Sequence, residues 1–473
     1  MEQLTHRRLN DIFLSLDRNE KILNTYFDSW LAWPIIKGEL WSFLLTYKTR
    51  NEYKKRSNLL NKFIGCFKGC VNLLFIFFCS KSKYIFVYSP KDGNGREKID
   101  RIFEVLLNEY ENEALKILYE WGDVKNKKLK KNTLYESYVG NVFFLFSILI
   151  SKNKPIRDTT FKLCQEIKNY FPEDLMGPIF KKCSINLSIF FLKYNFYKYL
   201  FRRTQAIKLF IQDPDAKPGE VAAAKLLKIP VVEIQHGMFG PDDVDYSWKS
   251  TARKLKSYMP VSDQILVYGS AWKDILLSNG FWHESEIKVI AHSEINFYRR
   301  LKNRPSRLYQ PIILLFPTQN HVRSKGIYFL KALLDYQAKK KENLFKVIIK
   351  IHPTEWRMSS CYEKLSVDFP RSCYVLPLKA NSYLSLLDAH IVIGFSSLMM
   401  IEAVALQIPA ISIGEKEDGG FCEIYHLEQL KKWIPHFCDP IALYDYLKYL
   451  AQEQRYLALQ ENLREISESF YSV

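Results

Sequence analysis

The segment HIVIGFSSLMMIEAVALQIPAISIG, residues 390–414, carries the pattern that decides the fold. Short apolar runs stand at its two ends, and residues 398–407 between them have the length and composition of a helix. The runs PIILLFPTQN (311–320) and FKVIIKIHP (345–353) precede it, separated by a helix predicted near 325–340. Strands that are buried on both faces give continuous Val and Ile runs of this kind. The pattern therefore predicts a parallel, doubly wound sheet of Rossmann type.

The same alternation of strand and helix occurs in the first half of the chain. Its elements are YIFVYS (84–89), IKLFIQDPD (207–215), the helix EVAAAKLLK (220–228) and the strand IPVVEIQHG (229–237). We therefore predict an α/β protein of two Rossmann-like, doubly wound domains that face one another across a cleft. The boundary is predicted near residue 260, which gives domains 1–260 and 261–473, with QILVYG (264–269) and IKVIAH (287–292) in the second. Ligands of such sheets bind beyond the carboxyl ends of the strands.

Composition and charge limit the partners of the chain. The sequence has 473 residues, 48% of them hydrophobic, and 68 Lys plus Arg against 51 Asp plus Glu, so its net charge is 68 − 51 = +17. A basic surface attracts phosphate-bearing cofactors, acidic lipid or nucleic acid, and composition alone does not separate these. No nucleic-acid-binding motif is present, so no specific nucleic-acid partner is expected.

The cysteines and the apolar runs suggest a location. The nine cysteines follow no paired framework and the opening MEQLTHRRLN resembles no secretory signal, so a cytoplasmic location is expected. The run VFFLFSILI (142–150) and the stretch SINLSIFFLKYNFYKYLFRR (184–203) are candidates for a basic, apolar face that rests on anionic lipid at the inner side of the plasma membrane. Core helices and strands are the alternative interpretation of the same stretches.

Small and hydroxyl-bearing residues follow the strand at 390–394. Gly394 ends the strand, and Ser396 and Ser397 occupy the start of the next helix. Hydroxyls and free backbone N–H groups at a helix N-terminus form a phosphate site. Glu402 lies further along this helix and is a candidate to accept the hydroxyls of a ribose. The alternative is ordinary helix capping.

A histidine follows the neighbouring predicted strand. In VIIKIHPTEW, His352 stands where a buried strand ends, and an imidazole there is able to donate to a phosphate oxygen. Thr318, at the end of the run 311–320, is a further candidate phosphate ligand, and Glu355 is a candidate either to orient His352 or to cap the next helix. We expect these residues to share one anion site because the carboxyl ends of parallel strands lie at one edge.

The stretch PVVEIQHGMFGPDDVDY is the most distinctive of the first half. A strand ends at Gln235, His236 and Gly237, and the glycine permits a tight loop close to an acceptor. His236 is our candidate for a general base that deprotonates an acceptor hydroxyl, and Asp242 and Asp243 are rival candidates. A histidine that only holds the loop is the alternative.

Metal binding is not expected. Two D-x-D strings occur, at 213–215 and 243–245, and such strings hold a divalent metal in some sugar transferases. The βαβ unit that continues beyond 215 fits a metal-independent architecture better. Cys66 and Cys70 lack the second pair that would complete a zinc site.

The pair KIHPTEW and IGFSSLMMIEAVALQIPAI resembles the HP and SS motifs of GT-B glycosyltransferases of bacterial surface polysaccharide synthesis. Bacterial sialyltransferases, 3-deoxy-manno-octulosonate transferases and teichoic-acid polymerases carry such motifs. The loop IQHGMFGPDD and the stretch WPIIKGEL (33–40) are similar to uncharacterised proteins of capsule and lipopolysaccharide clusters.

The resemblance implies a GT-B fold and a glycosyltransferase that needs no metal and no further cofactor. Its donor would be a CMP-, UDP- or GDP-linked sugar, and its acceptor a growing, lipid-linked capsule or lipopolysaccharide glycan. It also implies that His352, Ser396, Ser397 and, less directly, Glu402 contact the donor nucleotide. An enzyme like the UDP-sugar 2-epimerases and a non-catalytic scaffold of a polysaccharide assembly complex are the two alternatives.

Overall fold

The computed structural model describes most of the chain. The described residues are 6–52, 66–74, 82–88, 101–119, 132–246, 248–301, 311–319, 322–352, 355, 358–378, 380–395, 397–414, 422 and 427–471. These residues form two compact units. The first includes most of the residues up to Val267 and the segment Lys273–Lys288, and the second includes Tyr268–Trp272 and Val289–Val473.

The first unit is built on a seven-stranded sheet in the order β5-β4-β3-β6-β7-β8-β9. The strands are β3 (Tyr84–Tyr88), β4 (Ala114–Leu118), β5 (Thr133–Tyr135), β6 (Lys208–Ile211), β7 (Val231–Ile234), β8 (Gln264–Val267) and β9 (Ile287–Val289). The pairings from β5 through to β8 are parallel. The sheet order reverses direction between β3 and β6, as in a Rossmann fold.

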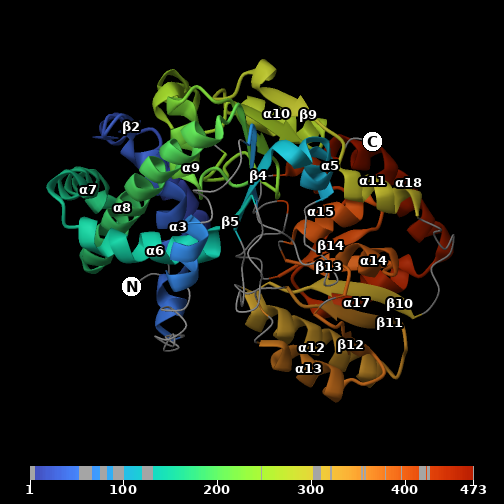
Figure 1. The fold of residues 1–473 in the computed structure, drawn as a ribbon. Coiled ribbons are helices and arrows are strands. Elements are labelled where there is room, and N and C mark those ends of the chain that lie inside the picture. Colours follow the sequence, from blue (N-terminus) through green and yellow to red (C-terminus); the bar gives the residue numbers. More distant parts are fainter. Residues whose placement is uncertain are drawn as a thin grey trace. The chain divides into compact units, whose positions relative to one another are not determined.

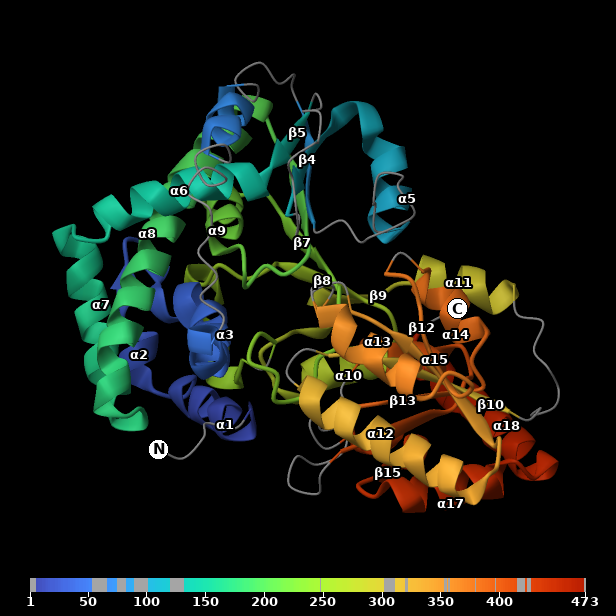
Figure 2. The same ribbon diagram turned by 90° about the horizontal axis from the view of Figure 1, so that it is seen from below.

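Helices surround α8 in this unit (Figures 1 and 2). The helices of the first part of the chain are α1 (His6–Leu16), α2 (Glu20–Leu23), α3 (Ala32–Glu52), α5 (Arg101–Tyr110), α6 (Glu136–Ile150), α7 (Lys154–Ile167), α8 (Glu173–Thr204) and α9 (Pro218–Leu226), and a short hairpin pairs β1 (Tyr26–Phe27) with β2 (Trp30–Leu31). Among the described residues, α8 is the one helix long and apolar enough to cross a membrane. It packs against α3, α6, α7 and α9, as a core helix does.

The second unit is built on a six-stranded sheet in the order β12-β11-β10-β13-β14-β15, in which neighbouring strands pair in parallel. The strands are β10 (Ile312–Pro317), β11 (Phe345–Lys350), β12 (Cys373–Val375), β13 (Ile391–Gly394), β14 (Ala410–Ile413) and β15 (His436–Phe437). Numbered along the chain, this order is the 3-2-1-4-5-6 order of a Rossmann sheet. Its reversal lies between β10 and β13.

Helices cover both faces of the second sheet. The helices of this unit are α11 (Ser293–Arg300), α12 (Arg323–Lys340), α13 (Ser359–Asp368), α14 (Ser382–Leu387), α15 (Leu398–Ala405), α17 (Pro440–Leu450) and α18 (Glu453–Phe470). Helix α10 (Ser270–Ser278) begins in the second unit and continues in the first. Apolar side chains of α12, α13 and α17 pack on one face in a single core with β10 and β11. Figure 1 shows α15 on the opposite side of this sheet from α12 and α13.

The fold class predicted from the sequence is confirmed, because each unit is a Rossmann-like α/β domain, the pair of domains that a GT-B fold contains. One assignment differs. The strands expected in the second domain at 264–269 and 287–292 are β8 and β9, which extend the first sheet beside β7. A strand followed by a helix has the same sequence pattern in either sheet, so the pattern does not show which sheet receives the strand.

Candidate active site

An ion pair between His236 and Asp213 lies at the carboxyl edge of the first sheet. Asp213 follows β6 and His236 follows β7, and these strands are neighbours. The His236 Nε2 atom contacts the Asp213 carboxylate, while its Nδ1 atom is buried and has no hydrogen-bond partner among the described residues. About a third of the His236 side chain is exposed. The sequence predicts His236 as a base, and the structure adds the carboxylate that orients it.

The carboxylate controls the protonation of the histidine. Burial alone would lower the pKa of His236, but the adjacent charge of Asp213 outweighs burial and raises that pKa above its ordinary value. Burial opposes ionisation of Asp213, yet His236 and Lys217 hold its pKa well below the usual range. The pair is therefore an imidazole with an ionised partner, the arrangement that stabilises an imidazolium after it has taken a proton.

Asp213 is held in an unusual backbone conformation. Its φ is 51°, in the left-handed region that side chains other than glycine adopt at a cost. The buried Nζ of Lys217 donates to the carbonyl oxygens of Gln212, at 2.6 Å, and of Asp213, at 3.2 Å, and lies 3.6 Å from Asp213 Oδ2. Lys217 thus fixes both the turn and the carboxylate that contacts His236.

Replacement of Lys217 and replacement of Asp213 are expected to shift the pKa of His236 in opposite directions. Lys217→Met removes a nearby positive charge that lowers this pKa, so the pKa rises, whereas Asp213→Asn removes the charge that raises it, so the pKa falls. Titration of the labelled imidazoles by NMR measures both shifts. Lys208→Met, on the strand that leads to Asp213, is the control that leaves His236 unchanged. If the pKa of His236 is the same in Lys217→Met as in the wild type, the lysine does not have this role.

Two further carboxyl groups, those of Asp215 and Asp245, lie near the His236–Asp213 pair and interact electrostatically with it. Burial, followed by repulsion from Asp243, raises the pKa of Asp245 to about 7, and burial, Asp245 and Asp213 raise that of Asp215 well above normal. The charge of Asp245 contributes to the raised pKa of Asp215, so ionisation of one carboxyl group opposes ionisation of the other.

Helix α3 reaches this carboxyl pair through a glycine. A Cβ atom added to Gly38 would lie 3.1 Å from Asp245 Oδ1 and 3.2 Å from Asp215 Oδ2. A side chain at this position would press on both carboxyl groups, which would have to move away from the helix. The stretch WPIIKGEL, noted in the sequence, therefore forms part of this site.

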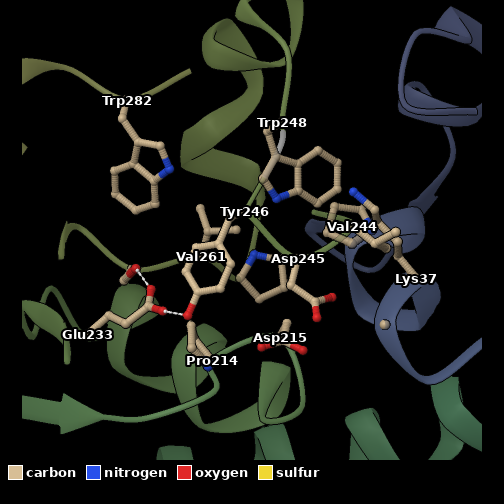
Figure 3. Close-up of a pocket in the computed structure, with 14 residues that line it drawn as sticks. Lys37, Pro214, Asp215, Glu233, Val244, Asp245, Tyr246, Trp248, Val261 and Trp282 are labelled. Carbon is tan, nitrogen blue, oxygen red and sulfur yellow. Dashed lines mark hydrogen bonds between the residues drawn. The ribbon is translucent and has the colours of Figure 1, made fainter. Parts of the chain in front are cut away.

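These carboxyl groups line a pocket in the first unit (Figure 3). Its walls include Trp248, Tyr246 and Trp282, three aromatic side chains that offer apolar surface and polar edges. The Trp282 Nε1 atom is buried and has no hydrogen-bond acceptor among the residues that the structure describes. Glu233 lies in the wall with both oxygens bonded, one to Tyr246 Oη at 2.8 Å and one to Ser262 Oγ at 2.7 Å. The polar groups that the pocket offers to a ligand are thus the carboxyl groups of Asp215 and Asp245 and the indole N–H of Trp282.

The other residues predicted for the site in the first unit hold the loop that follows β7. Gln235 is buried and its Nε2 donates to the Gly237 carbonyl oxygen at 2.8 Å, which closes the turn after β7. Asp243 accepts the backbone N–H of Asp245 at 2.9 Å, and Asp242 lies 3.8 Å from Lys249 Nζ. The two rival base candidates are therefore engaged with their own loop, whereas His236 keeps an unbonded nitrogen.

The residues predicted to bind the nucleotide of the sugar donor lie where the strand order of the second sheet reverses. Thr318, His352 and Gly394 stand at the carboxyl ends of the neighbouring parallel strands β10, β11 and β13. The His352 backbone N–H donates to Thr318 Oγ1 at 2.9 Å. Ser397 is the N-cap of α15 and accepts the Met399 backbone N–H at 3.3 Å. Ser396 lies outside the described residues.

Glu355 connects His352 with Arg323, because its backbone N–H donates to the His352 carbonyl oxygen at 2.8 Å and its carboxylate pairs with Arg323. Burial lowers the pKa of His352, an effect that Glu355 opposes, so the imidazole is neutral near pH 7. Glu355 is itself almost fully buried and accepts a hydrogen bond from Arg323 Nε, at the start of α12, at 2.9 Å. Sequence reasoning did not single out Arg323, although its place after β10 is the same edge of the sheet.

Glu402 lies inside the second unit. Its side chain is buried, and Oε1 accepts a hydrogen bond from Tyr383 Oη at 2.9 Å. Tyr383 in turn stacks on Tyr298, with ring centroids 4.9 Å apart. The ribose-binding role of Glu402 stays a prediction.

Within the described part of the chain, no group of three or more His, Cys, Asp or Glu side chains is arranged to hold a metal ion. Of the string 213–215, Asp213 contacts His236 and Asp215 lines the pocket together with Asp245.

No family model matches the chain, and no curated protein matches it. Among solved structures, it is similar to HepE of Anabaena in complex with UDP and glucose, at 10% identity over 82% of this chain and 95% of that chain, with a TM-score of 0.43. The UDP-GlcNAc 2-epimerase of Methanocaldococcus jannaschii in complex with UDP-GlcNAc and UDP matches at 12% identity, 82% and 99% coverage and a TM-score of 0.45. The wall teichoic acid polymerase TagF matches at 12% identity, 87% and 93% coverage and a TM-score of 0.41. At these values the likeness carries no argument about the reaction.

Proposed function

We propose that this protein is a metal-independent glycosyltransferase that moves a sugar from a nucleotide-activated donor to a growing capsule or lipopolysaccharide glycan in the cytoplasm. The observation that carries the proposal is the pair of sites at the carboxyl edges of two Rossmann sheets. One holds a histidine with an ionised carboxylate partner, and the other holds hydroxyl, imidazole and helix N-terminal groups at the point where the strand order reverses.

The second unit binds the donor in this proposal. The N-terminus of α15, with Ser397 as its cap, Thr318 and His352 hold the phosphate of a CMP-, UDP- or GDP-linked sugar. A neutral His352 donates one N–H to a phosphate oxygen as negative charge develops on the leaving nucleotide. Ser396 and Glu402 complete the donor site, with Glu402 at the ribose. No further cofactor takes part.

The first unit supplies the base. His236 Nδ1, the ring nitrogen that Asp213 leaves unbonded, takes the proton of an acceptor hydroxyl, whose oxygen attacks the anomeric carbon while the bond from that carbon to the phosphate oxygen breaks. Asp213 stabilises the imidazolium that results. One displacement of this kind inverts the anomeric configuration. Asp215, Asp245 and Trp282 Nε1 provide hydrogen-bonding groups for the hydroxyls of the acceptor glycan in the neighbouring pocket.

The reaction catalysed separates this proposal from its two alternatives. We expect the protein, incubated with a panel of CMP-, UDP- and GDP-sugars and glycolipid acceptors, to release nucleotide only when an acceptor is present, as followed by phosphorus NMR. Acceptor-independent formation of an epimeric sugar indicates an enzyme of the 2-epimerase kind. Intact donor with every acceptor, from a protein that binds glycan, indicates the scaffold.

A further inference from the structure

The second half of helix α6 exposes apolar side chains that no described element covers. The exposed residues, which we call the α6 tip, are Phe144, Leu145, Phe146, Ile148 and Leu149, each with 44–68% of its side chain accessible. The opposite side of the same turns is buried through Val142, Phe143 and Ser147. The helix is therefore apolar all round, although one side of it alone meets the protein core.

An apolar outer face of this kind has few explanations. Solvent-facing helices of globular proteins carry polar residues on the side away from the core, and the stretch from Val142 to Ile150 carries no charged residue at all. Contiguous exposed apolar surface marks a site of contact with another protein or with lipid. Figures 1 and 2 show α6 leading away from β5 toward α7, which places the tip at the end of the helix remote from the sheet.

Basic residues adjoin the tip. Lys152, Lys154, Arg157 and Lys162 follow it and are all exposed, and Asp158 is the one exposed acidic residue from Ser151 to Lys162. Phe161, 57% exposed, lies among them on α7. An apolar surface bordered by positive charge matches the boundary of an anionic membrane, where apolar side chains enter the acyl region and basic ones remain among the headgroups.

We infer that the α6 tip and the basic start of α7 dock the protein on an anionic lipid surface. The exposed turns, from Phe144 to Leu149, rise about 9 Å along the helix axis. This length suits shallow insertion at the interface and is far below the roughly 30 Å needed to span the hydrocarbon core. The inference goes beyond the proposed reaction, because lipid docking needs neither a donor nor an acceptor.

Vesicle flotation of the full chain tests the inference. We expect the wild type to float with vesicles of phosphatidylcholine mixed with phosphatidylglycerol and to bind weakly to phosphatidylcholine alone. The double variant Leu145→Ser, Leu149→Ser is expected to lose at least about tenfold in partition coefficient, because two leucines no longer enter the apolar phase. The double variant Lys152→Glu, Lys154→Glu is expected to lose about tenfold in partition coefficient on the anionic vesicles and to be unchanged on phosphatidylcholine vesicles.

The matched control removes apolar side chains elsewhere that are more exposed than Leu145 and Leu149. Tyr328 and Val367, 77% and 76% exposed in the second unit, change to serine without effect on flotation if the tip is the docking surface. Leu149→Ser alone is the reserve variant should the double variant fail to fold. A wild type that floats with neither vesicle, or a tip variant that floats like the wild type, overturns the inference. So does a wild-type dimer, seen by sedimentation, that binds no vesicles and that the tip variant converts to a monomer.

Discussion

His236→Ala is expected to lower kcat/KM for sugar transfer by about 10³-fold, within the range of 10² to 10⁴ that general bases contribute. This corresponds to about 4 kcal/mol of transition-state stabilisation. The reason is the contact of its Nε2 with Asp213, which provides a base with an ionised partner and which no other candidate in the loop shares. Initial rates of nucleotide release at saturating donor measure the loss.

The pH dependence identifies the histidine as the base. A base works in its neutral form, so activity falls as the pH drops through the raised pKa of His236. Asp213→Asn removes the charge that raises this pKa, so the acid limb moves to lower pH while the maximal rate also falls. His283→Ala, at an exposed histidine of the first unit, is the matched control. Full activity in His236→Ala, with an unchanged acid limb, rules out this base.

Lys193→Met is expected to destabilise the first unit by about 3–5 kcal/mol, the usual cost of leaving a buried charge unpaired. Lys193 Nζ lies 2.5 Å from Glu136 Oε1 and 3.6 Å from Glu220 Oε1, and all three side chains are buried. Tyr119 and Tyr197 complete the cluster through hydrogen bonds to Lys193 and Glu136. Urea unfolding followed by tryptophan fluorescence measures the change.

The pH dependence of this loss has a definite sign. Burial already raises the pKa of Glu136, partly offset by Lys193, and loss of the cation raises it further. Between the ordinary and the raised pKa the folded state binds the extra proton, so the stability of the variant falls as pH rises through this window. The loss should therefore be larger at pH 8 than at pH 5.

Lys182→Met provides the comparison on the same helix. Its ion pair with Glu39, at 2.6 Å, is partly exposed, and such pairs contribute about 0–1 kcal/mol. If both lysine variants lose the same free energy of unfolding, the buried cluster stabilises the protein no more than the exposed ion pair does.

The sequence predicts much of the fold because its signal is local. Continuous Val and Ile runs such as 345–350 and 391–393 mark strands buried on both faces, and these are β11 and β13. The place of β8 and β9 is not local. It depends on the hydrogen bonds of β8 to β7 and of β9 to β8, which leave no trace in the runs themselves.

The candidate site divides in the same way. A histidine at the end of a strand is visible in the sequence, which correctly places His236 and His352 at the ends of β7 and β11. The residues that contact these histidines come from other elements of the fold. In the sequence, Asp213 stands out only as part of a D-x-D string of the kind that binds a divalent metal in some sugar transferases. The order of the strands supplies the missing signal, because Asp213 ends the strand next to that of His236. Gly38 and Lys217 act through the backbone and through carbonyl oxygens, to which residue patterns are blind.

Calorimetric titration of the full chain with CMP, CDP, UDP, GDP and dTDP tests the donor site, on which the account depends, most directly. We expect one nucleotide base to bind, and binding to be lost in both Ser397→Ala and His352→Ala. Asp439→Ala, which removes the N-cap of α17 in the same unit, is the control that keeps the affinity. At a hundredfold excess over its Kd, the bound nucleotide also stabilises the protein by about 2.7 kcal/mol. Absence of binding by every nucleotide, or binding that persists in both variants, contradicts the account.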